Sequence, residues 1–302
     1  MSLRSLCDIP APAKLNLFLH VVGRRDDGYH LLQSVFTLID WCDTLHVERR
    51  GDGRLQRHDL GDPLPADDLC LRAARALQAA TGCTLGADLS IEKRLPSGAG
   101  MGGGSSDAAS TLLALNRLWG LGLSRGRLQE IALGLGADVP FFIGGRTAWV
   151  EGIGERMTPV VLPPQRYVVV KPRASIETRA IFTSELLRRD TEPAILAGFL
   201  AGDGVARITS GHGRNDLQPP AEALSSEVGE AIAWLTTRYG NGRMTGSGSA
   251  VFARLGPASA GNDDAHDASA AAVTSDLPAG WAGRRCRSLD QHPLVDWAAD
   301  DA

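Results

Sequence analysis

The sequence contains no apolar run of about 18 residues, the length that a membrane-spanning helix needs. Its first residues also lack the apolar core of a secretory signal. The five cysteines are odd in number, scattered along the chain and without Cys-x-x-Cys spacing, which argues against a disulfide framework or a zinc site. These absences predict a cytoplasmic protein with reduced, buried thiols and no membrane partner.

An excess of positive charge is absent as well. The chain has 31 lysine and arginine residues against 35 aspartate and glutamate residues, for a net charge of −4. A nucleic-acid-binding protein is normally basic, so nucleic acid is not an expected partner. With 302 residues, 43% of them hydrophobic, the chain can instead bury one large core or two ordinary domains.

Glycine is abundant at one place, in Leu-Pro-Ser-Gly-Ala-Gly-Met-Gly-Gly-Gly-Ser-Ser-Asp at residues 95–107. A strand pattern precedes this stretch and an apolar helical pattern follows it, which disfavours the alternative of a flexible surface loop. Glycines let the backbone approach a ligand closely, and a helix start offers unpaired N–H groups and a positive dipole end. The stretch therefore predicts a phosphate site.

Two common phosphate motifs fit this loop poorly. Gly98–Gly103 matches Gly-x-Gly-x-x-Gly, but no acidic residue lies between Asp107 and Glu130 to hold the ribose of a dinucleotide. The P-loop is excluded because Gly104 is followed by serine and not by lysine. Backbone N–H groups and a serine hydroxyl can still hold a nucleotide phosphate, and Lys14 is the candidate for the missing cation.

Polar residues alternate with leucines from Ala13 onward, which predicts a strand over residues 8–21. Lys14 and Asn16 share one face of it and could reach one site, or that face could simply be solvated. Asp138 precedes Val139-Pro140, and proline is favoured in the first turn of a helix. Asp138 is therefore expected at or next to a helix N-terminus, where it could also be a simple cap.

The remaining patterns favour an α+β fold over a doubly wound sheet, because strands and helices do not alternate strictly. Two domains are expected, residues 1–160 and 161–302, with Pro163-Pro164 near the boundary. The expected strands are 31–39, 44–49, 54–59, 87–93, 146–150, 167–171, 251–255 and 284–289. The expected helices are 69–81 capped by Asp67, the stretch from the glycine loop to Gly120, 124–135, 178–188, 221–238 and the middle of 257–280.

The glycine loop, Pro-x-Gly-x-Gly-x-Gly-Gly-Gly-Ser-Ser, resembles the ATP loop of the GHMP kinases. Five further motifs keep the order expected of one branch of this family: Ala-Pro-Ala-Lys-Leu-Asn-Leu at 11–17, Gly-Tyr-His at 28–30, Gly-Ala-Asp-Val-Pro at 136–140, Asn-Asp-Leu at 215–217 and Thr-Gly-Ser-Gly-Ser-Ala-Val-Phe at 245–252. The resemblance covers residues 10 to 255. It implies a two-domain GHMP kinase fold with its active site in the cleft between the domains.

For function, the resemblance implies transfer of the ATP γ-phosphoryl group to the tertiary hydroxyl of a cytidine diphosphate-linked polyol, in isoprenoid precursor synthesis. Asp138 would be the base, Lys14 would lie beside it, and Asn16 would orient the substrate. This is consistent with the chemistry, because phosphoryl transfer depends mainly on positioning and charge neutralisation. The implied ATP-binding residues are Pro96, Gly98, Gly100, Gly102, Gly103, Gly104, Ser105 and Ser106.

The cytidine end is expected to lie against Tyr29, with His30 reading the edge of the base. Phe182 would close this slot, with Thr178 near the ribose or phosphate, although Phe182 could equally be a core residue. Gly246 and Ser247, in the second glycine-serine turn, are expected to close on the substrate phosphates; a plain hairpin turn is the alternative. Mg²⁺ is implied with the nucleotide, no protein metal ligand is predicted, and the expected state is a monomer or weak homodimer.

Three other functions remain open at this point. A related kinase acting on another alcohol, such as homoserine, is disfavoured by the motifs at 11–17 and 28–30. A non-catalytic sensor is disfavoured by the Lys14–Asp138 pair, because a binding module needs no base. A dinucleotide-dependent oxidoreductase lacks its acidic residue.

Overall fold

A computed structural model describes residues 3–201, 203–257 and 276–301. Its strands are β1 (Ser5–Arg24), β2 (His30–Arg50), β3 (Leu55–Asp59), β4 (Gly86–Glu92), β5 (Ala148–Glu151), β6 (Arg156–Pro159), β7 (Gln165–Lys171), β8 (Arg243–Met244), β9 (Val251–Pro257) and β10 (Ala282–Leu289). Its helices are α1 (Leu69–Thr81), α2 (Gly103–Leu118), α3 (Arg125–Leu133), α4 (Val139–Gly144), α5 (Thr178–Thr183), α6 (Leu196–Ala201), α7 (Gly204–Ser210), α8 (Gln218–Leu224), α9 (Ser226–Tyr239) and a short 3-10 helix, η1 (Val295–Trp297). The α+β class is confirmed.

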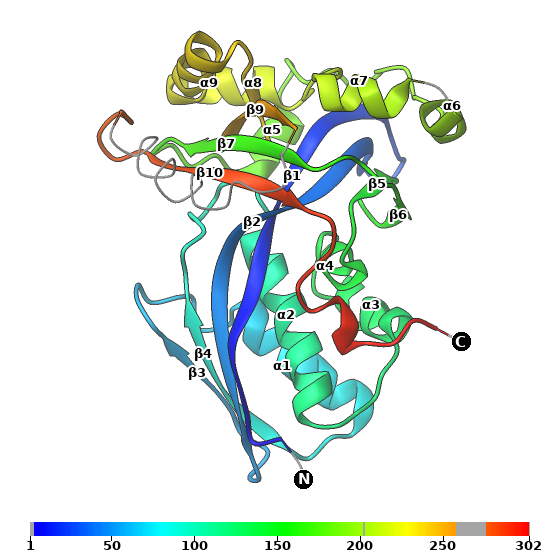
Figure 1. Ribbon diagram of the computed structural model, residues 1–302, viewed down its shortest axis with the longest axis vertical. Coiled ribbons are helices and arrows are strands. Elements are labelled where there is room, and N and C mark those ends of the chain that lie inside the picture. Colours follow the sequence, from blue (N-terminus) through cyan, green and yellow to red (C-terminus); the bar gives the residue numbers. More distant parts are fainter. Residues whose placement is uncertain (1–2, 202, 258–275, 302) are drawn as a thin grey trace.

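The long antiparallel pair of β1 and β2 runs through most of the molecule (Figure 1). Strands 31–39 and 44–49 were expected to be separate, but this expectation was wrong. The residues between them keep pairing with β1, as Pro12 opposite Cys42 and Ala11 opposite Asp43 show. The irregularity is a register shift between Pro12 and Ala13, and it lies immediately before Lys14.

The sheet follows the order β3-β4-β2-β10-β7-β9-β8, and β1 and β5 pair with β2. Helices α1, α2 and α4 bury their apolar residues against β1, β2 and β4, while residues of α5, α8 and α9 pack with β7 and β9. Figure 1 shows these two groups of helices in the lower and upper parts of the molecule. Strand β10 connects the parts, because it pairs with both β2 and β7.

Several predicted boundaries changed. The cap of α1 is Asp68 and not Asp67, since its carboxylate accepts the backbone N–H groups of Cys70 and Leu71. The helix expected over 178–188 ends at Thr183. The helix expected over 221–238 is two helices, because extended backbone at Ser225 separates α8 from α9.

Helices α6 and α7 and strands β6 and β8 were not predicted from the sequence. The surface helix expected in the middle of 257–280 lies almost entirely at 258–275, outside the described residues. The prediction of buried thiols holds for Cys70 and Cys286, whereas Cys7 is exposed and all five cysteines are free. Within the described chain, no helix is both long and apolar enough to cross a membrane.

Candidate active site

The glycine loop forms the wall of a cavity of about 470 Å³. Residues 95–105 line it together with Lys93 and Asp107. Gly98, Gly100 and Gly102 all have positive φ, and Gly102 is the N-cap of the 16-residue helix α2. No side chain caps this helix, so its first N–H groups remain available to an anion, as the sequence predicts.

The second glycine turn packs directly against the first. A Cβ on Gly100 would lie 2.6 Å from the carbonyl oxygen of Thr245, and one on Gly246 would lie 2.5 Å from the carbonyl oxygen of Gly100. The backbone N–H of Ala250 donates to the carbonyl of Ala99 at 3.1 Å. Residues almost 150 positions apart thus form one structure, and glycine is required where the two backbones meet.

Lys14 lies under the first loop and is only 3% exposed. Its Nζ donates to Oδ1 of Asn16 at 2.5 Å, lies 3.5 Å from Oδ2 of Asp138, and sits 4.1 Å from the centre of the Phe36 ring. Its backbone N–H donates to the carbonyl of Met101 in the loop at 2.9 Å. The solvated-face alternative is therefore wrong: burial lowers the pKa of Lys14, and Asp138 opposes that shift.

Asp138 immediately precedes helix α4 but makes no side-chain cap hydrogen bond. The carboxylate faces Lys14 instead, and its side chain is 33% exposed. The alternative that Asp138 is a simple helix cap is therefore wrong for its side chain. Lys14 and Asp138, 124 positions apart in the sequence, form an ion pair with a buried cation and an accessible carboxylate.

Asn16 is buried at 1% exposure and fully engaged within the protein. Its amide nitrogen donates to Oγ of Ser34 at 3.0 Å while its amide oxygen accepts from Lys14. Its backbone N–H donates to Oγ1 of Thr245 at 2.8 Å. Asn16 therefore connects the lysine to the second glycine turn.

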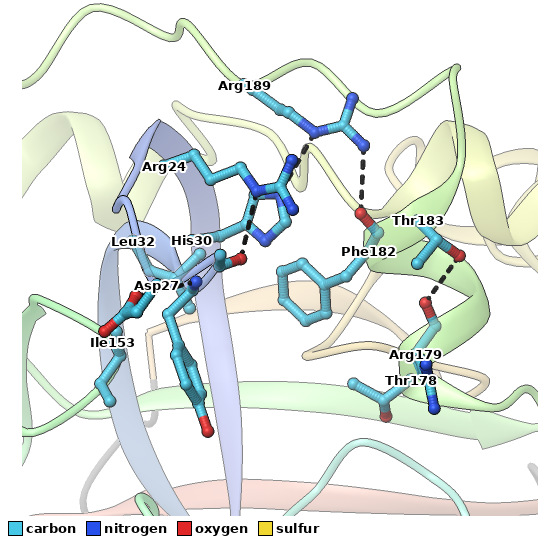
Figure 2. Close-up of a pocket in the computed structure, with 12 residues that line it drawn as sticks. Arg24, Asp27, His30, Leu32, Ile153, Thr178, Arg179, Phe182, Thr183 and Arg189 are labelled. Carbon is cyan, nitrogen blue, oxygen red and sulfur yellow. Dashed lines mark hydrogen bonds between the residues drawn. The ribbon is translucent and has the colours of Figure 1, made fainter.

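A second cavity, of about 910 Å³, lies at the turn between β1 and β2 (Figure 2). Tyr29 lines it and is 60% exposed. The rings of His30 and Phe182 stack with centroids 5.0 Å apart and an interplanar angle of 30°. Figure 2 shows Phe182 pointing from α5 toward His30, so the structure brings together the aromatic residues expected to bind a nucleobase.

Thr178 connects the two cavities. It lines the larger cavity, and its Oγ1 lies 2.9 Å from Oγ of Ser247 in the second glycine turn. That turn in turn contacts Gly100 of the first loop. Every predicted site residue is therefore part of one connected region. Ser106 is fully buried there, and its hydroxyl has no hydrogen-bond partner among the residues that the structure describes.

One cluster at this site was missed by sequence reasoning. Lys93 forms ion pairs with Asp43 and, at 2.5 Å, with Asp107. Asp43 also accepts the backbone N–H groups of Arg94 and Leu95, and so fixes the entry to the glycine loop. Burial raises the pKa of Asp107 to about 7, although Lys93 opposes this shift.

The sequence signals for this cluster differed in strength. Lys93 ends the predicted strand before the loop and could have been considered a second cation there. Asp43 had no signal, because its partners lie 50 and more positions away. Asn215 belonged to a quoted motif without a role; its amide donates to the carbonyls of Met244 and Gly246 and holds the second glycine turn.

Two parts of the chain match models of known protein families. Residues 68–146 match the model of the GHMP kinases N terminal domain, and residues 196–281 match that of the GHMP kinases C terminal domain. The chain belongs to the GHMP kinase family, whose members are ATP-dependent phosphotransferases.

Within this family, the chain is similar to proteins named 4-diphosphocytidyl-2-C-methyl-D-erythritol kinase. That of Methylibium petroleiphilum is 61% identical over 99% of this chain and 100% of the relative, and that of Paracidovorax citrulli is 57% identical with the same coverage. A crystal structure of 4-(cytidine 5'-diphospho)-2C-methyl-D-erythritol kinase superposes with a TM-score of 0.74 at 34% identity, covering 93% of this chain and 98% of the other.

Proposed function

We propose that this chain is an ATP-dependent kinase that phosphorylates the 2-hydroxyl group of 4-diphosphocytidyl-2-C-methyl-D-erythritol, a step of isoprenoid precursor synthesis. The single observation that carries the chemistry is the Lys14–Asp138 pair beneath the phosphate loop, with its Nζ–Oδ2 distance of 3.5 Å. The full-length relatives at 57–61% identity support the choice of substrate over homoserine or another alcohol. They equally favour a catalyst over a sensor or an oxidoreductase.

The roles of the two residues follow from their surroundings. Asp138 is accessible and accepts the proton of the substrate hydroxyl as that oxygen attacks the γ-phosphorus. Lys14 is buried beside this carboxylate and stabilises the negative charge that develops on the transferring group. Asn16 acts on the substrate through Lys14, because its amide oxygen holds the ammonium in place.

The two substrates occupy different cavities, ATP the one along the glycine loop and the cytidyl substrate the larger one. The triphosphate of ATP lies along residues 96–106, at the N-terminus of α2. The cytosine lies against Tyr29 in the larger cavity with its edge toward His30, beside Phe182, and Thr178, Gly246 and Ser247 approach the diphosphate. Residues 1–160 thus carry the ATP loop and contribute Tyr29 and His30, and residues 161–302 complete the site from the substrate side.

Mg²⁺ enters with the nucleotide in this proposal, and neutralises phosphate charge when bound. Two oxygens at the start of α2 fit such an ion: Oδ1 of Asp107 and Oγ of Ser106 are both buried and have no hydrogen-bond partner in the described part of the chain. Carboxylate and hydroxyl oxygens are suitable ligands for Mg²⁺, which commonly keeps most of its contacts to phosphate and water. The described residues contain no cluster of three acidic, histidine or cysteine side chains that would hold a metal by themselves.

The proposal is tested with Asp138→Asn and Lys14→Met. Loss of a general base or of a charge-stabilising cation lowers kcat by about 10²–10⁴-fold. The assay measures ADP release with the cytidyl substrate, homoserine or mevalonate as acceptor, while circular dichroism verifies the fold. Wild-type turnover in either folded variant would remove that residue from the mechanism, and turnover of homoserine alone would refute the substrate.

A further inference from the structure

Arg189, which follows α5, holds the wall of the larger cavity together. Its Nε donates to Nε2 of His30 at 3.1 Å, and one of its terminal nitrogens donates to the carbonyls of Phe182 and Ser184. Its other terminal nitrogen donates to the carbonyl of Leu187. Figure 2 shows the His30 ring between the guanidinium of Arg189 and the ring of Phe182.

The bond from Arg189 determines which nitrogen of His30 carries the proton. A guanidinium group has only donors, so Nε2 of His30 must be the acceptor and cannot bear a hydrogen. A neutral imidazole has one N–H group, which is therefore on Nδ1. Among the described residues Nδ1 of His30 has no hydrogen-bond partner, so this donor is available in the cavity.

The charges around the ring keep it neutral. Arg24 and Arg189 both lie close to it, and Arg179 and Asp27 line the same cavity. Burial lowers the pKa of His30, and the positive charges of Arg189 and Arg24 lower it further. Near neutral pH the ring thus presents one donor to the cavity and keeps its acceptor turned to Arg189.

We infer that Arg189 is a positioning residue that selects the nucleobase: it holds His30 as an Nδ1–H donor, which matches cytosine and not uracil. The inference rests on the proposed function, since it assumes a pyrimidine in this cavity. The N3 atom of cytosine is an acceptor, whereas N3 of uracil carries a hydrogen. Uracil would place a donor against a donor and leave both unpaired in a partly buried site, which discriminates strongly between the bases.

The kinetic test compares the cytidyl substrate with its uridyl analogue in wild type, Arg189→Met and Arg189→Lys. In Arg189→Met the ring is free to exchange tautomers, so we expect the KM for the cytidyl substrate to rise about tenfold, with kcat and the KM for ATP little changed. The preference for cytidyl over uridyl substrate should fall by a similar factor. Arg189→Lys keeps a hydrogen-bond donor at this position, so it should retain more of this preference than Arg189→Met does.

Arg188→Met is the matched control. Arg188 is the adjacent arginine and its side chain is 57% exposed and paired with Asp190, so its removal changes the same charge without touching His30. It should leave the base preference of the wild type intact. An equal loss of preference in Arg188→Met and Arg189→Met would overturn the inference, because the effect would then come from net charge.

A spectroscopic readout separates this inference from the proposed function. In ¹⁵N-histidine NMR of the wild type, His30, assigned with His30→Asn, should show a protonated Nδ1 and an unprotonated Nε2. Arg189→Met should show tautomer exchange and a raised pKa for this ring. A wild-type His30 protonated on Nε2 would overturn the tautomer assignment, whereas absence of turnover with either nucleotide substrate would overturn the proposed function.

Discussion

Lys14, which we propose as the charge-stabilising cation, is a buried ammonium group. Moving an ammonium group out of water is costly, and in this protein Asn16, Asp138 and the face of Phe36 compensate for that cost. None of these partners neutralises the lysine completely, since the Asp138 oxygen is 3.5 Å away and its side chain stays accessible. The ammonium therefore retains charge that can act on an incoming phosphate.

Tyr29 is the residue on which binding of the cytidyl substrate can be tested without disturbing the core. Its ring is 60% exposed at the mouth of the larger cavity. Because stacking on a base contributes about 1–3 kcal/mol, Tyr29→Ala should raise the KM for the cytidyl substrate by about tenfold or more. Steady-state kinetics with each substrate varied in turn measure this effect.

The KM for ATP provides the internal control in that experiment, because Tyr29 lies in the larger cavity and not in the one formed by the glycine loop. The thermal unfolding midpoint should stay near that of the wild type, since an exposed ring contributes little to the core. Equal increases in both KM values would contradict the assignment of Tyr29 to the cytidine end.

Residues within short motifs could be placed from the sequence, and residues acting across long separations could not. Lys14, Asp138, Tyr29 and His30 each stand in a motif whose order along the chain predicts a shared site. Arg189 has no such motif, and its role depends on where a loop after α5 meets a ring 159 positions earlier. Burial, which sets the electrostatics of Lys14, also depends on tertiary packing that no local pattern encodes.

At the scale of elements, the contact between the two glycine segments organises the site. Gly100 and Gly246 approach each other so closely that neither position has room for a Cβ. This contact positions the phosphate loop relative to Ser247 and thus relative to the larger cavity. The sequence predicted both turns separately, but only their packing explains why both contain glycine at the point of contact.

Gly100→Ala tests this contact. The residue has φ +71°, and a Cβ would lie 2.6 Å from a carbonyl oxygen, so the variant combines backbone strain with a clash against main chain. Positive φ costs a non-glycine residue about 1–2 kcal/mol, and the clash should add to this. We expect a lower free energy of unfolding in urea and a KM for ATP raised at least several-fold.

Gly120→Ala is the matched control for strain alone. Gly120 has φ +68°, but a Cβ there would meet no atom within 4 Å. The free energy of unfolding of Gly120→Ala should fall only by the cost of positive φ, and its KM for ATP should stay at the wild-type value. Equal effects of the two substitutions on stability and on ATP binding would show that the contact between the glycine segments is unimportant.

The helices that position the site could be predicted only in part. The helix after the glycine loop ends near Gly120 as expected, because its apolar residues repeat regularly and a glycine stops it. The helix expected over 178–188 was too long, and the one expected over 221–238 is two helices. In both cases apolar spacing continues past a serine, Ser184 or Ser225, at which the backbone becomes extended. The end of α5 at Thr183 and the extended backbone at Ser184 set the positions of Phe182 and Arg189 relative to each other.

At the scale of the whole molecule, the last residues return to the first half of the chain. After β10, the backbone N–H of His292 donates to the carbonyl of Gly145 at 2.7 Å, at the end of α4. Figure 1 shows this C-terminal segment beside α3 and α4. Since α4 begins immediately after Asp138, residues distant from the cavities help to fix the position of the carboxylate that we propose as the base.

Arg125, the first residue of α3, holds this arrangement together, and Arg125→Met should weaken it. Its guanidinium donates to the carbonyl of Ile143 in α4 and to the carbonyls of Val295 and Ala298 in the C-terminal segment. Its side chain is only 14% exposed, so methionine would leave partly buried carbonyls unpaired. Because these three carbonyls are only partly buried, each should cost less than a fully buried unsatisfied group, which costs about 1–3 kcal/mol, and we expect a loss of about 2–4 kcal/mol in the free energy of unfolding.

Kinetics on the folded fraction show whether this segment also acts on catalysis. A small displacement of α4 would misplace Asp138, so Arg125→Met should lower kcat about tenfold and change the KM for ATP little. The control is Arg127→Met, two residues along the same helix, where an exposed pair with Glu130 should contribute less than about 1 kcal/mol. If Arg125→Met lost stability but kept the wild-type kcat at temperatures well below unfolding, the C-terminal segment would stabilise the fold without positioning Asp138.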